Sequence, residues 1–328
     1  MKKLLHLWLK GPRIAARLSG EQIKNMTSDM VYLKKYVCSE FVRVPNSFKE
    51  VDKWKATEFR LFLLFLSPVL LYKYLPSTYM KHLLVFHCVI RILCHPQDYK
   101  KKNEYAKKLL LYFVQCYSDL YGTENMIYTV HNLIHSSDDA KQFGPLDSFS
   151  AFPFENHLHS LKKILRKHEK PLQQIDRRII ERNAASKLKI WPNAVKYPIP
   201  VSQNNNKIPF QCSESYDILQ MRYFKLSCSK VADSFCFLQN NKIVKIRHIG
   251  LQNGTPVIIG QEYINYSSYT LYPCDSRHIN VFVIDDDLTE LKYFPISEIS
   301  KKAVVLPWNG KERFCAFPLL HSDILEGI

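Results

Sequence analysis

The sequence predicts an α+β protein, with an all-helical N-terminal two thirds followed by a small β-rich C-terminal part. Three observations lead to this prediction. Apolar residues recur at helical spacing as far as residue 190, short runs rich in β-branched and aromatic residues begin near residue 215, and the net positive charge lies wholly in the first part. The 328 residues, 46% of them hydrophobic, suffice for one large domain or two ordinary ones.

Helices in the first part are predicted from apolar periodicity and from residues typical of helix ends. A Ser19 cap begins a helix over 19–37, and a Thr57 cap begins an almost wholly apolar helix over 57–75 that we expect to be buried. Gly122 is typical of a C-cap and ends a further helix. The helix that ends at Gly122 covers 101–122, and the remaining predicted helices cover 77–94, 123–144, 154–168 and 171–187.

The predicted domain boundary lies at residues 191–214, which are rich in Pro and Asn and show no periodicity. Such a stretch is typical of an extended linker, so we expect a basic helical domain over 1–190 and a β-rich domain over 215–328. Short β-rich runs between 221 and 320, separated by turn signals such as Asn253-Gly254, predict a small antiparallel barrel or sandwich.

The charge is divided unevenly between these two parts. Residues 1–214 carry 34 Lys+Arg and 18 Asp+Glu, whereas residues 215–328 carry 12 of each, so the whole net charge of +16 lies in the first part. A surface of this kind attracts polyanions, DNA foremost among them. The alternative is a basic surface that only keeps the protein soluble. The neutral C-terminal part fits a protein partner better than DNA.

The sequence gives no sign of secretion or of a membrane span. The longest apolar stretch, Leu61 to Tyr72, contains Pro68 and is well short of the roughly 20 residues that a spanning helix needs. The N-terminal apolar run is too short for a secretory signal. The nine cysteines form no CxxC pair, which favours reduced, buried thiols over a zinc site or a disulfide framework.

Two short patterns could suggest a metal site, and neither is convincing. His131 and His135 would share one face of a helix, but Asn132 stands where metalloproteases carry their catalytic Glu. Asp138 and Asp139 are adjacent, so on a helix they point about 100° apart and do not converge on one ion. We therefore expect no metal here. The histidines are expected to be hydrogen-bonded in or beside a helical core, and the two acids to be solvated at a helix end.

The stretch AFPFENHLHSLKK, residues 151–163, raises a different possibility. Its helix is predicted to bury one apolar face, and the neighbouring stripe begins at Glu155 and then turns basic. After Pro153, Glu155 lies in the first turn, where the helix dipole favours an anion. It is therefore either an acid at a helix start or a carboxylate that could hold Mg²⁺ beside a phosphate backbone. The face predicted to be buried consists of Phe154, Leu158, Leu161 and Leu165.

A basic run follows this carboxylate. Residues 151–190 contain ten Lys+Arg and four acids. A solvated helix face explains many such runs, and contact with nucleic acid or with an acidic partner explains the others. The residues we expect to bind nucleic acid are Lys162, Lys163, Arg166, Lys167, Arg177 and Arg178.

The stretch GPLDSFSAFPFENHLHSLKKILRKHEKPLQQIDRRIIER, residues 144–182, resembles transposase-like proteins of the CACTA (En/Spm) superfamily, especially the animal proteins described as transposase domain-containing. The segments KGPRIAARLSGEQI, VPNSFKEVDKWKATEFRLFLLFLSPVLL, VHNLIHSSDDAKQFG and YFPISEISKKAVVLPWNGKERFCAFPLLHS fit the same family, so the resemblance covers nearly the whole chain. It implies a ribonuclease-H-like core in which two Asp and one Glu bind two metal ions to cut and join DNA. A helical insertion separates the second acid from the third. Glu155, in FPFE, is the residue that matches the third acid.

The resemblance also implies what this chain lacks. In such proteins the second acid precedes a segment that leads into KKLLHLWLKGP, so a chain that starts at Met1 is expected to begin just after that acid. Plant relatives carry Asp-Cys-His where this chain has Glu58-Phe59-Arg60, so no role of that Cys or His is carried over. One carboxylate cannot assemble a two-metal site. Mg²⁺ is therefore expected only in an intact family member.

These expectations together describe a truncated, transposable-element-derived protein. We expect it to bind nucleic acid without sequence specificity and to have no catalytic activity of its own, and we favour the nucleus over the cytoplasm. One alternative is a subunit of an intact DNA transposase whose gene model is incomplete. Another is a domesticated nuclear interaction protein that binds a protein partner through 215–328.

Overall fold

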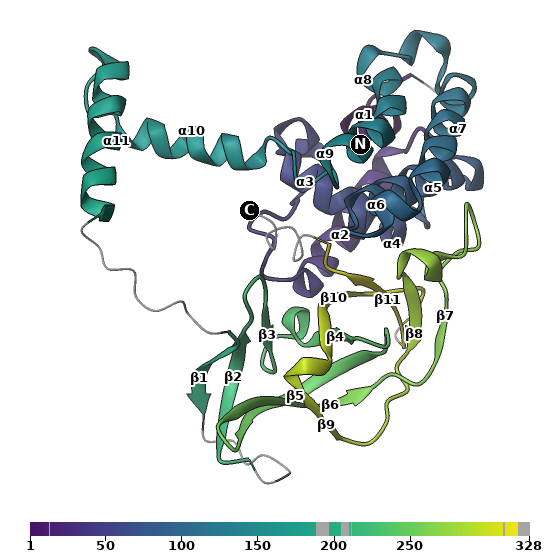
Figure 1. The fold of residues 1–328 in the computed structure, drawn as a ribbon. Coiled ribbons are helices and arrows are strands. Elements are labelled where there is room, and N and C mark those ends of the chain that lie inside the picture. The colour runs from purple at the N-terminus through teal and green to yellow at the C-terminus, as the bar shows by residue number, and fades with distance from the viewer. Residues whose placement is uncertain (13, 188–196, 205–209, 211, 311, 321–328) are drawn as a thin grey trace.

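The computed structural model describes residues 1–320 apart from 13, 188–196, 205–209, 211 and 311 (Figure 1). Helices make up the N-terminal part, and the C-terminal part is an antiparallel sheet of eleven strands. The α+β prediction is therefore confirmed at this level. Among the described helices, none combines the length and the apolar character that crossing a bilayer requires. All nine cysteines are free thiols.

The helical elements follow one another along the first 187 residues. The α-helices are α1 (Lys2–Leu9), α2 (Gly20–Leu33), α3 (Ala56–Leu61), α4 (Ser67–Leu71), α5 (Ser77–Cys94), α6 (Asp98–Lys101), α7 (Asn103–Tyr121), α8 (Tyr128–His131), α9 (Ser136–Phe143), α10 (Phe152–Ile164) and α11 (Pro171–Lys187). The short 3₁₀ turns of this part are η1 (Lys34–Tyr36), η2 (Phe48–Lys53), η4 (Thr123–Asn125) and η5 (Asn132–His135), and η3 (Phe62–Leu66) is a π-helical turn.

The strands occupy the rest of the chain. They are β1 (Ile199–Asn204), β2 (Glu214–Gln220), β3 (Lys225–Ser227), β4 (Phe235–Leu238), β5 (Ile243–Gln252), β6 (Thr255–Glu262), β7 (Tyr266–Ser268), β8 (Phe282–Asp285), β9 (Lys292–Pro295), β10 (Ile299–Pro307) and β11 (Arg313–Pro318). The 3₁₀ turns η6 (Val231–Asp233), η7 (Ser276–Ile279) and η8 (Ile296–Glu298) lie between them.

The helix ends that we predicted from local sequence were partly correct. Ser19 caps α2, since its hydroxyl accepts from the Gln22 amide, and the Gln22 side chain accepts from the Ser19 amide in return. α7 ends at Gly122, whose φ of 88° suits glycine. The Thr57 cap is wrong: the N-cap is Lys55, whose amide donates to the Glu58 carboxylate 2.8 Å away.

The helix predicted over 123–144 is broken into four short pieces, η4, α8, η5 and α9. Residues 123–144 therefore do not form one continuous α-helix, although their apolar residues recur at helical spacing. By contrast, α5 and α11 have the bounds predicted for them.

The buried apolar helix contains a π-helical turn whose backbone carbonyls are satisfied by other side chains. The Ser67 amide donates to the Phe62 carbonyl, five residues back, and Pro68 has no amide hydrogen to donate. The Leu63 and Leu64 carbonyls are therefore left without their usual helical partners.

Two buried residues of α5 supply the missing donors. His87 Nδ1 donates to the Leu63 carbonyl over 2.9 Å, and Arg91 donates to the Leu64 carbonyl over 3.3 Å. Burial, followed by the nearby charge of Arg91, lowers the pKa of His87 to about 3, so its imidazole is neutral. The interior histidine and arginine thus have a structural explanation.

The strand order is β1-β2-β5-β4-β10-β11-β8-β7, with β3 paired to β2 and with β6 paired to β5 and β9. All of these pairs are antiparallel. The described strands do not close into a ring, because β1 and β7 end the path. β1 lies within residues 191–214, so this part of the predicted linker is a strand of the sheet.

Alternate residues of the central strands face two different clusters of buried side chains. In β4, Phe235 and Phe237 belong to the smaller cluster, whereas Cys236 and Leu238 belong to the larger one. β10 and β11 alternate in the same way. Both faces of the central strands are therefore buried.

The larger cluster joins the helices to the sheet. It runs from Leu4 in α1 to residues that follow β11, and the Phe65 ring meets the Phe317 ring at 5.9 Å. Residues 1–150 and the sheet therefore share one hydrophobic core. α10 and α11 lie apart from it: Figure 1 shows α10 leaving the helical part and α11 crossing its far end.

Candidate functional site

The arm, defined as α10 and α11 (residues 152–187), carries the basic residues singled out in the sequence. Its predicted buried face is wrong at two positions, because Phe154 and Leu158 are 69% and 58% exposed. Ile164 is instead the buried side chain, and Leu161 is half-buried. The reason is that α10 leaves the body, so no helix or sheet covers the apolar stripe near its start.

The cations of the arm form two groups. Lys162, Lys163, Arg166 and Lys167 are exposed, and none of them has a carboxylate partner among the residues that the structure describes. Lys162 and Lys163 lie in the last turn of α10, where the helix dipole also favours positive charge.

Arg177 and Arg178 are both paired with Glu181, over 3.1 and 2.7 Å. Their charge is therefore partly neutralised within α11. The structure thus brings four of the six predicted contact residues together as a run of cations with no carboxylate partner among the described side chains, and it places the other two in an ion-paired group on the next helix.

Gln174 holds the turn between the two helices. Its side-chain oxygen accepts from the amides of Arg166 and Lys167 over 3.1 and 3.3 Å, and its nitrogen donates to the Lys167 carbonyl over 2.9 Å. The backbone beneath two of the four cations is therefore fixed. We did not predict this role, although a glutamine in the first turn of a helix after a short loop is a recognisable signal.

An ion pair fixes the segment that leads into the arm. Arg60 binds Asp147 through two nitrogens, one of them Nε at 3.0 Å, and the Leu146 amide donates to the Leu93 carbonyl. Burial lowers the pKa of Arg60, but the charge and hydrogen bond of Asp147 together with Cys94 outweigh burial and raise the pKa. The base of the arm is therefore attached to the body by a partly buried, two-point contact.

Glu155 lies in the first turn of α10, and its side chain is outside the described residues. Two acids that precede it in the sequence are paired with cations: Asp147 with Arg60, and Asp138 with Lys107 over 2.9 Å. Both carboxylates are therefore already engaged by cations.

The histidine pair does not have the predicted arrangement. α8 ends at His131, and the residues up to His135 form a 3₁₀ turn, so the two do not share one face of an α-helix. Both side chains are exposed, which corrects the prediction of a place in or beside a helical core. Their ring centroids are 6.2 Å apart.

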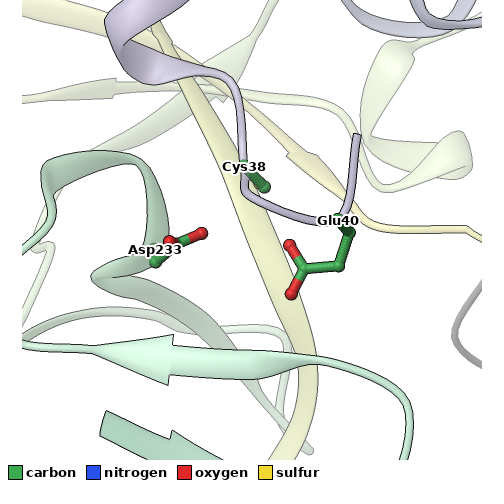
Figure 2. A group of neighbouring side chains, drawn as sticks. All are labelled: Cys38, Glu40 and Asp233. Carbon is green, nitrogen blue, oxygen red and sulfur yellow. The ribbon is translucent and has the colours of Figure 1, made fainter. Parts of the chain in front are cut away.

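One group of possible metal ligands occurs within the described parts of the chain. Cys38, Glu40 and Asp233 offer ligand atoms within 4.8 Å of one another, and Figure 2 shows these side chains converging from two separate segments. The ammonium group of Lys302 already occupies this site. It donates to Glu40 over 2.7 and 2.9 Å, to Asp233 over 2.5 Å and to the Lys225 carbonyl over 2.7 Å.

The remaining contacts of this group are also structural. The Ser39 amide donates to Asp233, and the Lys225 amide donates to Glu40, each over 3.0 Å. Burial raises the pKa of Cys38 to about 12, so this thiol is protonated and is a poor metal ligand. The Lys302 cluster, meaning Lys302, Glu40 and Asp233, therefore joins the segment after η1 to the sheet.

The comparisons with known proteins concern only the sheet. A family model described as "Domain of unknown function (DUF8592)" matches residues 202–319, which run from within β1 to just after β11. Neither the curated proteins nor the solved structures include a match to this chain.

Proposed function

We propose that this chain is a nucleic-acid-binding protein derived from a CACTA-type transposase, and that its arm contacts the phosphate backbone without reading base sequence. The observation that supports this proposal is the run of four exposed cations at Lys162, Lys163, Arg166 and Lys167, which have no carboxylate partner in the described part of the chain. Phosphate contacts of this kind supply most of the affinity of sequence-independent binding.

The position of these cations also supports binding to a large polyanion. They lie on two consecutive segments that project from the body, so a rod-like ligand can approach them without meeting the sheet (Figure 1). A favourable helix dipole explains Lys162 and Lys163 alone, but it does not explain Arg166 and Lys167, which follow the helix end.

The ancestry of α10 belongs to the same proposal. By its resemblance, α10 derives from the helix that carries the third acid of a ribonuclease-H-like core, and the helices before it derive from the helical insertion. Residues 1–328 by themselves are proposed not to cut or join DNA, because the resemblance matches only Glu155 to an acid of the site, and one carboxylate supplies too few oxygen ligands for two metal ions. Cutting of DNA by the purified protein with Mg²⁺ or Mn²⁺, lost on Glu155→Gln, would contradict this part.

A second candidate is a nuclear interaction protein that binds a protein partner through the C-terminal part. The observation that favours it is the charge of residues 215–328, where 12 cations balance 12 acids. A third possibility, a subunit of an intact transposase, predicts the same behaviour of the arm. Pull-down with the full chain, compared with and without nuclease treatment, separates a protein partner from one bridged by DNA.

The test of DNA binding is its salt dependence. Four phosphate contacts give a slope of about −3.6 in a plot of log affinity against log salt, so affinity for a random duplex is expected to fall about 150-fold between 50 and 200 mM salt. Fluorescence anisotropy with a labelled duplex of about 20 base pairs measures this slope.

A charge-matched control makes the test specific to the arm. Replacing Lys162, Lys163, Arg166 and Lys167 by Glu is expected to abolish binding. Replacing four exposed lysines of the body by Glu changes the net charge by the same amount and is expected to leave most of the affinity. That control uses Lys24, Lys49, Lys55 and Lys108. Equal losses in both variants, or binding that does not depend on salt, would refute the proposal.

A further inference from the structure

A pocket of about 260 Å³ lies where α2 and α4 meet the hairpin of β10 and β11. Its lining is dominated by aromatic side chains, and it also includes one acid, one lysine and an asparagine. The aromatic residues are Tyr32, Tyr36, Tyr72, Trp308 and Phe314, and the polar ones are Asp29, Lys73 and Asn309. Sites for drug-sized ligands measure roughly 300–1,000 Å³, so this pocket suits a smaller group such as a single base.

The aromatic rings of the pocket form two walls. On one side the hydroxyls of Tyr32 and Tyr36 are 3.2 Å apart, and on the other Tyr72 meets Trp308 edge-on at 4.8 Å between centroids. Tyr32 and Tyr72 are 51% and 55% exposed, whereas Trp308 is only 9% exposed. The rings of Tyr32 and Tyr72 are therefore exposed to solvent, whereas Trp308, which Tyr72 contacts, is buried. Exposed rings of this kind can stack on a nucleic-acid base.

The charges around the pocket argue against a cationic ligand. The Lys35 ammonium already lies 4.2 Å from the ring centroid of Tyr32 and 5.0 Å from that of Tyr36. The Asp29 carboxylate, which a cation would need, accepts from Lys73 and from the Tyr74 hydroxyl, each over 3.0 Å. An anionic ligand with a flat, apolar part fits these charges better.

We propose that this pocket binds one unstacked nucleotide, with its base stacked on the exposed rings of Tyr72 and Tyr32 and its phosphate held by Lys35, whose ammonium lies beside the Tyr32 ring. The nucleotide comes from a single-stranded nucleic acid or from a free nucleoside monophosphate, since both present the same chemistry. The first source rests on the nucleic-acid binding proposed above, but the pocket uses none of the residues of the arm.

The experiment compares three probes on the full chain. They are a fluorescein-labelled oligothymidylate of 15 nucleotides, a labelled duplex of the same length, and free dAMP followed by calorimetry. Stacking of one base contributes enough that Tyr72→Ala is expected to weaken oligothymidylate binding about 5- to 150-fold, with duplex binding unchanged. Tyr72→Phe keeps the ring and is expected to keep the affinity. Tyr128→Ala removes an exposed tyrosine of α8 outside the pocket and serves as the matched control.

The same probes distinguish a single-stranded nucleic acid from a free nucleotide as the ligand of the pocket. They also test the pocket separately from the proposed function of the arm. Tyr72-dependent binding of dAMP without any effect on the oligonucleotide identifies the free nucleotide as the ligand. If the duplex does not bind at all, the proposed function of the arm fails, while Tyr72-dependent binding of dAMP still supports the pocket. Equal binding of dAMP and oligothymidylate by the wild type, Tyr72→Ala and Tyr128→Ala overturns the inference. So does Tyr72-dependent binding of a trimethyllysine peptide with no binding of either nucleotide probe.

Discussion

Replacing Lys302 by methionine is expected to destabilise the protein strongly, because it removes the charge that two buried carboxylates share. Lys302 is fully buried, and the side chains of Glu40 and Asp233 are only 11% and 2% exposed. Methionine is close to lysine in length, so the substitution creates no large cavity in the core. The substitution leaves both acids without their cation and leaves the Lys225 carbonyl without one donor.

The size of the effect follows from this geometry. Removing one partner of a buried ion pair typically costs about 3–5 kcal/mol, because the other charge stays buried and unpaired. Unfolding entropies near 2.1 cal/mol/K per residue give about 0.7 kcal/mol/K for a chain of this length, so Tm is expected to fall by about 4–7 °C. Differential scanning calorimetry measures this shift.

The pH dependence gives the prediction a second readout. Burial raises the pKa of Asp233, but the hydrogen bond and charge of Lys302 together with the hydrogen bond from Ser39 outweigh burial and lower the pKa below 3.8. In the wild type this carboxylate therefore contributes stability above pH 4 and loses it as the pH falls further. In Lys302→Met burial and the hydrogen bond from the Ser39 amide remain, so the pKa of Asp233 is expected to rise relative to the wild type and the destabilisation to shrink as the pH falls towards 4.

A matched control separates this effect from the loss of any lysine. Lys292, from β9, has a side chain that is 49% exposed, and its partner Glu262 keeps a second cation, Lys242, over 3.2 Å, so Lys292→Met is expected to change stability by no more than about 1 kcal/mol. The double variant Lys302→Met/Asp233→Asn is expected to recover part of the loss. A Tm shift for Lys302→Met as small as that of Lys292→Met, with no dependence on pH, would refute the reasoning.

Three further predictions concern other contacts. Arg60→Met leaves its carboxylate partner half-buried and unpaired, so we expect a loss of about 3 kcal/mol and faster amide hydrogen exchange over 144–150 than in the wild type. The hydrogen bond from Cys88 lowers the pKa of Cys274 to about 7, so alkylation followed by mass spectrometry is expected to show a midpoint near pH 7 that rises in Cys88→Ala. Gly260→Ala brings a Cβ within 2.6 Å of the Lys245 carbonyl on the neighbouring strand, and denaturant unfolding is expected to show a loss of about 1–3 kcal/mol.

Features that depend on neighbouring residues were predictable from the sequence. The bounds of α5 and α11 follow from periodicity and flanking prolines, and Ser19 follows from its capping box. β1, β2, β7 and β9 were missed because they are short or rich in polar residues, so their strand structure depends on the partners with which they pair, which include β2, β1, β8 and β6. Whether strands pair depends on those partners more than on their own composition.

The site was predictable only in part for a related reason. Periodicity identifies the apolar face of α10, but it cannot say whether another element covers that face, and Phe154 and Leu158 turned out to be exposed. The charges of the arm were visible in the sequence, whereas the pairing of Arg177 and Arg178 with Glu181 required the geometry of α11. The residues that line the aromatic pocket come from positions between 29 and 314, so no local sequence motif predicts it.

The shared core has a consequence for synthesis of the chain. Glu40 and Lys302 are 262 residues apart, and the helices bury their apolar surface against strands that are translated later. At roughly 5–20 residues per second, a ribosome takes about 13–52 s to cover that distance. During this interval the nascent helical part exposes the surface that β10 and β11 later cover. We therefore expect the nascent chain to need chaperones while this apolar surface is exposed.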